Sequence, residues 1–423
     1  MDEVITERQK QINNEEIPKG YKLAGKIGVV PIDWEVKKFN EVFKINQGLQ
    51  IPISKRLKEP KEDSYFYITN EFIKNTGNDG KKYYIQNPSK SVICTKDDIL
   101  MTRTGNTGIV LTNVEGVFHN NFFKINYDRN LLNKNFVYYY LKSEYVQKMI
   151  KIYAGINTIS DLNHSDFYRI DFLFMGYKEQ QKIASILSTW DKTIELKEKL
   201  IEQKKEQKKG LMQKLLTGVV RLQGFEGEWK SVKIKEVCNV ISGGTPSTQK
   251  KEYWNGSIPW CIPTDITSSG KYIQNTERLI TNKGLKNSSA NLLPKNSILM
   301  CSRATIGPRS INKIAMATNQ GFKSFVCKED KLDYEFFYYL LFIYESRFKR
   351  LANGSTFLEV SKKDVENTKI FIPKDVNEQK EIGSILCYAD KEIELLNKEI
   401  NELKLQKKGL MQRLLTGKVR VKV

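Results

Sequence analysis

The chain has 423 residues, too many for one ordinary domain, so two or three domains are expected. Its apolar fraction of 40%, with 11% aromatic residues, is ample for packed cores and excludes a largely disordered chain. The 69 Lys and Arg residues against 49 Asp and Glu give a formal net charge of +20 at pH 7, which favours an acidic partner. Nucleic acid is the leading candidate, because neutralised phosphates release counterions; a solvated lysine-rich surface is the alternative.

The sequence predicts a cytoplasmic protein without a catalytic, metal or cofactor site. The first twenty residues are polar rather than a signal pattern, and no window holds eighteen apolar residues. The six cysteines form no close Cys-x-x-Cys pair, and the two histidines, His119 and His164, are too few for a metal site. A phosphate-binding G-x-x-x-x-G-K-[ST] loop and an amino-methyltransferase motif are also missing, so an ATP-driven motor or a free-standing methyl-transferring enzyme is disfavoured.

In chain order, residues 1–29 are polar and predict a flexible or loosely docked N-terminal extension. Residues 30–177 form a first globular region, which we call the first head. Its short β-branched and aromatic runs, such as residues 65–68, alternate with Gly, Asn and Pro and predict strands joined by loops. Residues 136–151 have a helical pattern, with aromatic side chains that suit a core.

Residues 178–218 have the heptad spacing of one long helix. Residues 377–417 repeat this segment without a gap, with most positions identical, so the chain is a tandem duplication. In the first copy the seam is weaker, because three of its positions are lysines: Lys197, Lys204 and Lys208. Each helix has one apolar stripe, so we expect the two to pair; the alternative is that each packs on its own head. A helix of this length would be a rod of roughly 57 Å that separates the heads.

Residues 224–376 form a second globular region, the second head, and a helical pattern covers residues 334–350. The two heads have diverged, but short matches remain, including Trp34 with Trp229 and the strand at residues 99–101 with that at residues 298–300. Both heads should therefore share one fold while differing in their loops.

Polar side chains in these loops are candidate DNA contacts, because Arg reads guanine, Asn and Gln read adenine, and Ser and Thr bind phosphates. The loops after the matching strands occupy corresponding places, and residues 120–121 match residues 319–320 in the sequence. The alternative is that these side chains satisfy the backbone of turns. The candidates are Arg103, Thr104, Asn106, Asn120, Asn121, Thr245, Ser247, Ser302, Arg303, Asn319 and Gln320.

Several motifs together resemble the specificity subunits of type I restriction–modification systems, over residues 18–423. They are residues 28–36 and 224–229, the Ser-Gly-Gly-Thr-Pro-Ser run at 242–247, Tyr-Trp at 253–254, Ile-Pro-Trp at 258–260, and the Glu-Gln-x-x-Ile to Gly-Leu-Met-Gln-x-Leu-Leu-Thr-Gly pattern that closes each half. Two departures are notable: Met175 stands where the second copy has Pro373, and Trp190 stands where the second copy has Ala389.

The resemblance implies an α+β fold with two α/β target recognition domains in tandem. Each would be followed by a long conserved helix, and the two helices would form an antiparallel coiled coil with pseudo-two-fold symmetry. It implies a non-catalytic subunit that reads a bipartite asymmetric site in double-stranded DNA. The implied partners are two modification subunits, which carry the adenine methyltransferase, and two restriction subunits, which translocate and cut DNA with ATP. The remaining alternative is a two-headed DNA-binding regulatory or structural protein without a methyltransferase partner.

Overall fold

The computed structural model describes residues 17–74, 82–155, 160–354 and 358–423. The chain divides into two compact units that do not follow the tandem halves of the sequence. Unit 1 combines Met1–Lys197 with Glu399–Val423, and unit 2 is Glu198–Lys398. Each unit therefore contains one head and part of each long helix.

Unit 1 is built on two four-stranded sheets, with strand orders β6-β5-β10-β7 and β4-β11-β8-β9, and two smaller antiparallel pairs, β1-β2 and β12-β3. In the two larger sheets only β5 and β10 pair in parallel. The elements are β1 (Tyr21–Ala24), β2 (Gly28–Pro31), β3 (Glu35–Lys38), α2 (Phe39–Val42), β4 (Lys44–Gln47), β5 (Ser64–Ile68), α3 (Asn70–Lys74), β6 (Tyr84–Gln86), β7 (Ile93–Cys94), β8 (Ile99–Thr102), β9 (Val110–Leu111), β10 (Gly116–Phe118), β11 (Phe122–Asn126), α4 (Lys134–Leu141), α5 (Glu144–Ala154), α6 (His164–Tyr168), β12 (Asp171–Phe174) and α7 (Tyr177–Leu215).

Unit 2 repeats this plan with a five-stranded sheet, β14-β21-β18-β19-β16, a three-stranded sheet, β17-β15-β20, and the pair β13-β22. Its elements are β13 (Trp229–Lys233), α8 (Ile234–Val237), β14 (Cys238–Ser242), β15 (Trp254–Cys261), α9 (Pro263–Ser269), β16 (Tyr272–Ile273), β17 (Arg278–Ile280), α10 (Asn282–Lys286), β18 (Ile298–Cys301), β19 (Arg309–Asn312), β20 (Ala317–Thr318), β21 (Phe322–Cys327), α11 (Tyr334–Leu351), α12 (Lys362–Asn367), β22 (Lys369–Pro373) and α13 (Val376–Leu415). The fold is α+β, as expected. No helix among the described residues has the length and apolarity that a membrane crossing needs.

The described part of the predicted N-terminal extension, residues 17–29, is folded onto unit 1. β1 and β2 form an antiparallel hairpin that crosses the expected boundary at residue 30, and Ala24 and Val30 are buried in the core of unit 1. The Tyr21 hydroxyl donates to the carbonyl oxygen of Gly417 at 3.3 Å. Two buried residues and this hydrogen bond dock the hairpin; residues 1–16 lie outside the described part.

The aromatic helical runs fill the cores, as predicted. Phe136 and Tyr140 on α4 are buried against Phe172, and α11 buries a similar row in unit 2. The single helix predicted for residues 136–151 is instead two, α4 and α5. Ser143 separates them because its extended backbone ends the helical path and its hydroxyl caps α5 by accepting the N–H of Val146.

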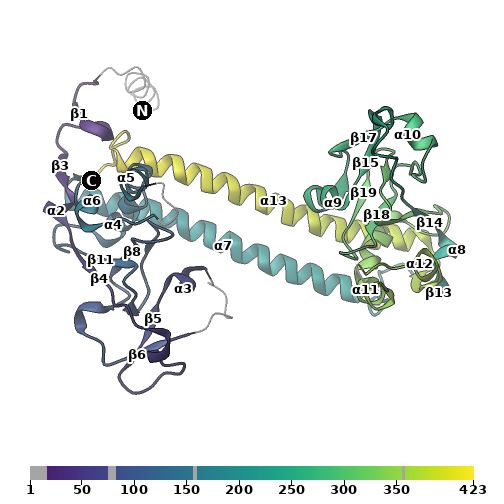
Figure 1. The fold of residues 1–423 in the computed structure, drawn as a ribbon, viewed down its shortest axis with the longest axis horizontal. Coiled ribbons are helices and arrows are strands. Elements are labelled where there is room, and N and C mark those ends of the chain that lie inside the picture. Colours follow the sequence, from purple (N-terminus) through teal and green to yellow (C-terminus); the bar gives the residue numbers. More distant parts are fainter. Residues whose placement is uncertain (1–16, 75–81, 156–159, 355–357) are drawn as a thin grey trace. The chain divides into compact units, whose positions relative to one another are not determined.

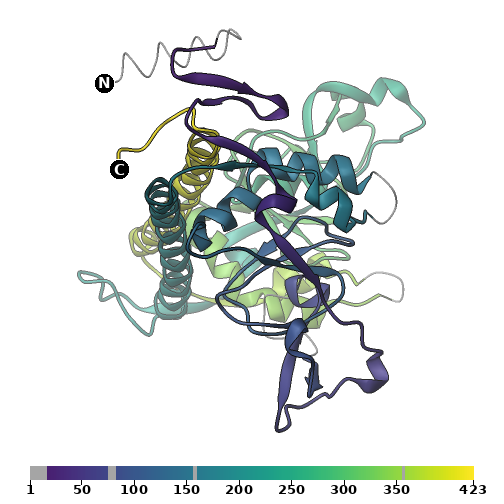
Figure 2. The ribbon, with the colours of Figure 1, turned by 90° about the vertical axis from the view of Figure 1, so that its left-hand side faces the viewer.

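The long helices α7 and α13 pair antiparallel in both units (Figures 1 and 2). In unit 1, Lys197 bonds Glu399 at 2.6 Å and Lys407 bonds Asp191. In unit 2, Lys204 bonds Glu392 at 2.8 Å and Lys208 bonds Asp390. Residue numbers rise along α7 as they fall along α13, which confirms that the helices pair with each other.

The chain that follows each long helix binds at the start of the other one. After α13, Arg420 bonds both oxygens of Glu179, which also accepts the Trp34 indole N–H at 3.1 Å. After α7, Arg221 bonds both oxygens of Glu378, which accepts the Trp229 indole N–H at 3.2 Å. Trp34 and Trp229, which match in the sequence, therefore each donate a hydrogen bond to the glutamate that binds the arginine.

Candidate nucleic-acid interface

A glycine directly after β4, Gly48, and one directly after β14, Gly243, let the following loop approach a neighbouring turn. A Cβ on Gly48 would lie 2.1 Å from the carbonyl oxygen of Phe118, and a Cβ on Gly243 would lie 1.9 Å from that of Asn319. Only glycine permits such contacts. The glycine motif seen in the sequence therefore serves backbone packing, and it brings the loop at residues 243–247 against the turn after β20.

Backbone hydrogen bonds define which loop residues correspond between the units. The N–H of Arg103 donates to the carbonyl of Asn121 at 2.7 Å, and the N–H of Ser302 donates to that of Gly321 at 2.8 Å. Ser302 is thus the counterpart of Arg103, and the loops after β8 and β18 correspond as predicted.

The match of residues 120–121 with residues 319–320 was wrong by one position. Phe122 pairs with Thr102, and Phe322 pairs with Cys301, so Asn120 corresponds to Gln320. Leu111 and Ser310 are equivalent in register, but the stretch from there to Phe122 or Phe322 is one residue longer in unit 2, which shifts the register.

In unit 1, the guanidinium of Arg103 is held by a carboxylate. One of its terminal nitrogens bonds Asp161 Oδ1 at 2.9 Å and Oδ2 at 2.7 Å, and the Thr104 hydroxyl also donates to Asp161. Only 15% of the Arg103 side chain is exposed, and its guanidinium lies 5.4 Å from the centre of the Phe123 ring. Arg103 is therefore part of a charge pair at the surface.

In unit 2, Glu359 occupies the place of Asp161. The N–H of Val360 donates to the Ser302 carbonyl at 3.0 Å, as that of Leu162 does to the Arg103 carbonyl at 2.8 Å. Lys323 bonds Glu359 at 2.9 Å, and Arg303 lies 4.0 Å from it. Carboxylates accept hydrogen bonds from the cytosine amino group, so both acids are candidate contacts that the sequence reasoning missed. A sequence pattern could have revealed them, because in both halves an acid is followed by an apolar residue and then by an Asn or Ser that caps a helix.

Two other candidate positions form equivalent side-chain pairs. The Asn120 amide donates to Gln50 at 2.9 Å, and the Thr245 hydroxyl donates to Gln320. Each pair links the loop after the glycine to the turn before β11 or β21. The amide groups at these positions can face the edges of bases, where Asn and Gln read adenine.

His119 and Asn319 have the same structural role. His119 Nδ1 accepts the N–H of Asn121 at 3.1 Å, and Asn319 Oδ1 accepts that of Gly321 at 2.9 Å. Burial lowers the pKa of His119, and the positive charge of Arg56 lowers it further, so the ring is neutral at pH 7. The Asn319 side chain thus satisfies a backbone N–H of its turn.

The other candidates divide by exposure. Ser302 is buried and its hydroxyl donates to the Gly321 carbonyl at 3.1 Å, so it stabilises the loop and is not retained as a DNA contact. The exposed candidates are Asn106, Thr245, Ser247, Arg303 and Gln320. Within the described ranges, no group of three His, Cys, Asp or Glu side chains could hold a metal ion.

Comparison with known proteins gives consistent matches. The family described as "Type I restriction modification DNA specificity domain" matches residues 31–205 and 226–405. The MjaVIII specificity subunit of Methanocaldococcus jannaschii is 27% identical over 93% of this chain and 94% of its own length. The MjaIX specificity subunit of the same organism is 38% identical, but that match spans only 42% of this chain and 41% of the relative.

A solved structure shares the fold. The type I restriction–modification S subunit from M. genitalium superposes with a TM-score of 0.54 at 21% identity, covering 93% of this chain and 97% of that one. Two domain matches cover most of the chain, one in each head and its following helix. The chain therefore belongs to the family of DNA specificity subunits of type I restriction–modification systems.

Proposed function

We propose that this chain reads a bipartite, asymmetric site in double-stranded DNA, one half-site with each head. The observation that carries the proposal is a common backbone with different side chains. Arg103, Asn120 and Asp161 in unit 1 correspond to Ser302, Gln320 and Glu359 in unit 2. Two surfaces of the same shape with different donors and acceptors suit two different short sequences.

Methylation mapping tests the proposal. Long-read sequencing of a host with and without this gene should yield one methylated motif that depends on the gene. We expect two unlike half-sites separated by an unread gap, with their centres about one helical turn apart. A continuous motif or a perfect palindrome would exclude this function.

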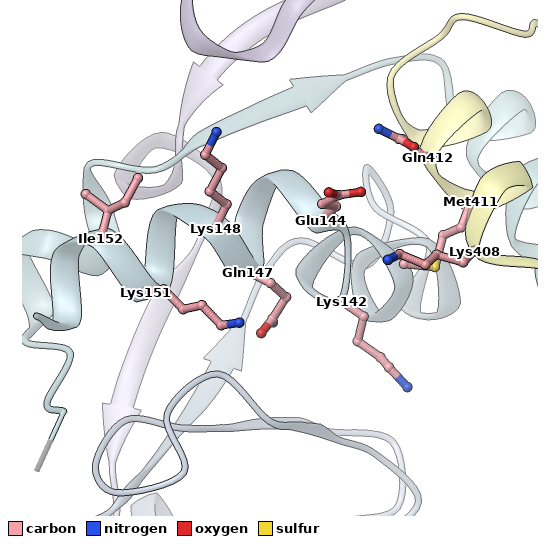
Figure 3. Close-up of a pocket in the computed structure, with 9 residues that line it drawn as sticks. All are labelled: Lys142, Glu144, Gln147, Lys148, Lys151, Ile152, Lys408, Met411 and Gln412. Carbon is pink, nitrogen blue, oxygen red and sulfur yellow. The ribbon is translucent and has the colours of Figure 1, made fainter. Parts of the chain in front are cut away.

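A pair of equivalent grooves supports the docking of two copies of one partner. In unit 1, a cavity of about 720 Å³ lies between α5 and α13 (Figure 3). In unit 2, one of about 620 Å³ lies between α11 and the paired long helices. The first is lined by Lys142, Glu144, Gln147, Lys148, Lys151, Ile152, Lys408, Met411 and Gln412.

The long helix contributes the same residue types to both grooves. Lys408, Met411 and Gln412 in unit 1 have the counterparts Lys209, Met212 and Gln213 in unit 2, while the head residues differ. A mixed surface of lysines with an apolar floor suits an acidic, partly apolar partner segment. We assign these grooves to the modification subunits, and hence two per chain.

Native mass spectrometry of the co-expressed complex tests this assignment. Met411→Glu should remove one modification subunit and leave the other, and Met212→Glu should do the same independently. The double variant should lose both. Full retention in the double variant would show that the partner binds elsewhere, and failure of the wild-type chain to retain any methyltransferase would favour a stand-alone DNA-binding protein.

A further inference from the structure

Two tryptophans of unit 2 fix the glycine loop at residues 243–247. The Trp260 indole N–H donates to the carbonyl of Gly244 at 2.9 Å, and that of Trp254 donates to the carbonyl of Ser247 at 3.1 Å. The two rings contact each other edge to face, with centres 5.0 Å apart. The loop that carries Thr245 and Ser247 is therefore tied at two points to a rigid aromatic pair.

An exposed arginine lies on this aromatic pair. The guanidinium carbon of Arg278, on β17, is 3.8 Å from the centre of the Trp254 ring and 5.2 Å from that of Trp260. Among the residues that the structure describes, no carboxylate lies within salt-bridge distance of Arg278. Its charge is thus uncompensated by an acid, unlike that of Arg103, and its position is set by the ring beneath it.

Unit 1 reaches the same arrangement from a different part of the chain. Tyr67 corresponds to Trp260 in strand register, and its hydroxyl donates to the carbonyl of Leu49 at 2.6 Å. The guanidinium carbon of Arg56 is 5.0 Å from the Tyr67 ring centre and 5.4 Å from that of Tyr83. Arg56 Nε also donates to the carbonyl of Ile51 at 2.9 Å.

The two arginines come from non-equivalent positions. Arg56 follows a short loop before β5, whereas Arg278 begins β17, the strand that pairs with β15. One ring beside each arginine, however, Tyr67 or Trp260, is at the same strand position and binds the same loop. Both heads therefore place a stacked cation beside the loop that holds the candidate base contacts.

We propose that Arg278 and Arg56 contact DNA, each in its own half-site, with the aromatic ring as the platform that orients the guanidinium. This inference rests on the proposed function. A planar guanidinium matches either two phosphate oxygens or the O6 and N7 acceptors of guanine. Because stacking fixes the guanidinium before DNA arrives, little side-chain freedom is lost on binding.

The test measures DNA affinity of the complete complex with a duplex that carries the mapped site. Arg278→Ala should weaken binding about 5- to 100-fold, and if Arg278 contacts a base the loss should disappear when the second half-site is already scrambled. A base contact would weaken the sequence preference at one position of that half-site. A phosphate contact would instead reduce affinity for every sequence and make the slope of log affinity against log salt concentration shallower by about one. Arg56→Ala should act in the same way on the first half-site only.

Arg347→Ala is the charge-matched control, because Arg347 is exposed on α11 and is not among the proposed contacts. Equal affinities of Arg278→Ala, Arg347→Ala and the wild type would overturn the inference.

Arginine modification of the wild-type complex by phenylglyoxal is a second test, and it does not depend on how a variant folds. DNA should protect Arg278 and Arg56 and leave Arg347 reactive; unprotected Arg278 would also overturn the proposal. A complex that binds no DNA at all would instead refute the proposed function.

Discussion

At the scale of single residues, Arg103 and its acid partner offer the sharpest test of half-site reading. Arg103→Ala would leave Asp161 without its cation and is expected to weaken binding by about 1–3 kcal/mol. The loss should be confined to the first half-site, measured on duplexes in which each half is scrambled in turn. Arg303→Ala, in the corresponding loop, should affect only the second half-site. A loss at both half-sites from either change would contradict the assignment.

His119 predicts a pH dependence of stability in unit 1. Its pKa is lowered from 6.5, so folding favours the neutral ring, whose Nδ1 accepts a backbone N–H. This stabilisation is complete above pH 6.5 and is lost as the pH falls through the lowered pKa. His119→Asn provides the acceptor that Asn319 provides in unit 2, without titrating.

We therefore expect the variant to lose less stability than the wild type between about pH 7 and pH 5. Urea midpoints at several pH values measure the difference. His164, whose pKa is also lowered by burial, is present in both proteins and cancels in the comparison. Parallel pH profiles would show that His119 does not titrate in this range.

At the scale of the helices, lysines in the heptad seam have a specific partner. Lys208 bonds Asp390, which also accepts the Tyr339 hydroxyl, and the Lys208 ammonium lies 5.4 Å from the Tyr339 ring centre. Lys407, Asp191 and Tyr139 repeat this arrangement in unit 1. One seam lysine in each unit, Lys208 or Lys407, is thus bound by an acid and an aromatic residue.

Lys208→Met should destabilise the protein by about 1–3 kcal/mol, because it leaves a half-buried carboxylate without its cation. Lys204→Met is the matched control, since its pair with Glu392 is more exposed, and should cost less than about 1 kcal/mol. Urea unfolding measures both. Equal losses would show that the contacts of Lys208 with Asp390 and Tyr339 add no stability beyond that of an ordinary ion pair.

The helices also predict how the gap in the DNA site can be altered. The unit boundary falls after Lys197 in α7 and after Lys398 in α13. One heptad inserted at both points leaves the contacts inside each unit intact and keeps the apolar stripe in phase. The added length of about 10 Å corresponds to about three base pairs.

We expect the methylated half-sites of such a variant to be unchanged and their gap to be wider by about three base pairs. Methylation mapping of the variant against the wild type measures this. Inserting the heptad in α7 alone is the control, because the partner helix then lacks the matching length. An active double insertion with an unaltered gap would show that the helices do not set the spacing.

At the scale of the whole molecule, the sequence predicted the elements better than the contacts between them. Heptad periodicity and duplication were enough to predict the paired helices, because a helix buried along one face has apolar residues at regular spacing in its sequence. The Arg103–Asp161 pair could not be predicted, since a polar contact between distant loops has no period. The shifted register at Asn120 arose from one extra loop residue, and the arginines on the aromatic platforms follow no shared motif.

The isolated chain is expected to be catalytically inert. We predict neither methyl transfer nor cleavage of DNA when the purified chain is given ATP, magnesium and S-adenosylmethionine. The reason is that the chain belongs to a family of DNA specificity subunits. Labelled methyl incorporation that scales with the concentration of a homogeneous preparation would contradict it.

The division of the chain into units has a consequence for synthesis on the ribosome. Unit 2 is one uninterrupted segment, Glu198–Lys398, whereas unit 1 needs Glu399–Val423 to be complete. Leu414 and Leu415 belong to the same core cluster as Ile183 and Leu187. During translation, we therefore expect the first head to emerge without the C-terminal residues of its core, which are synthesised only after the whole of unit 2. The half that is synthesised first is the last to finish folding.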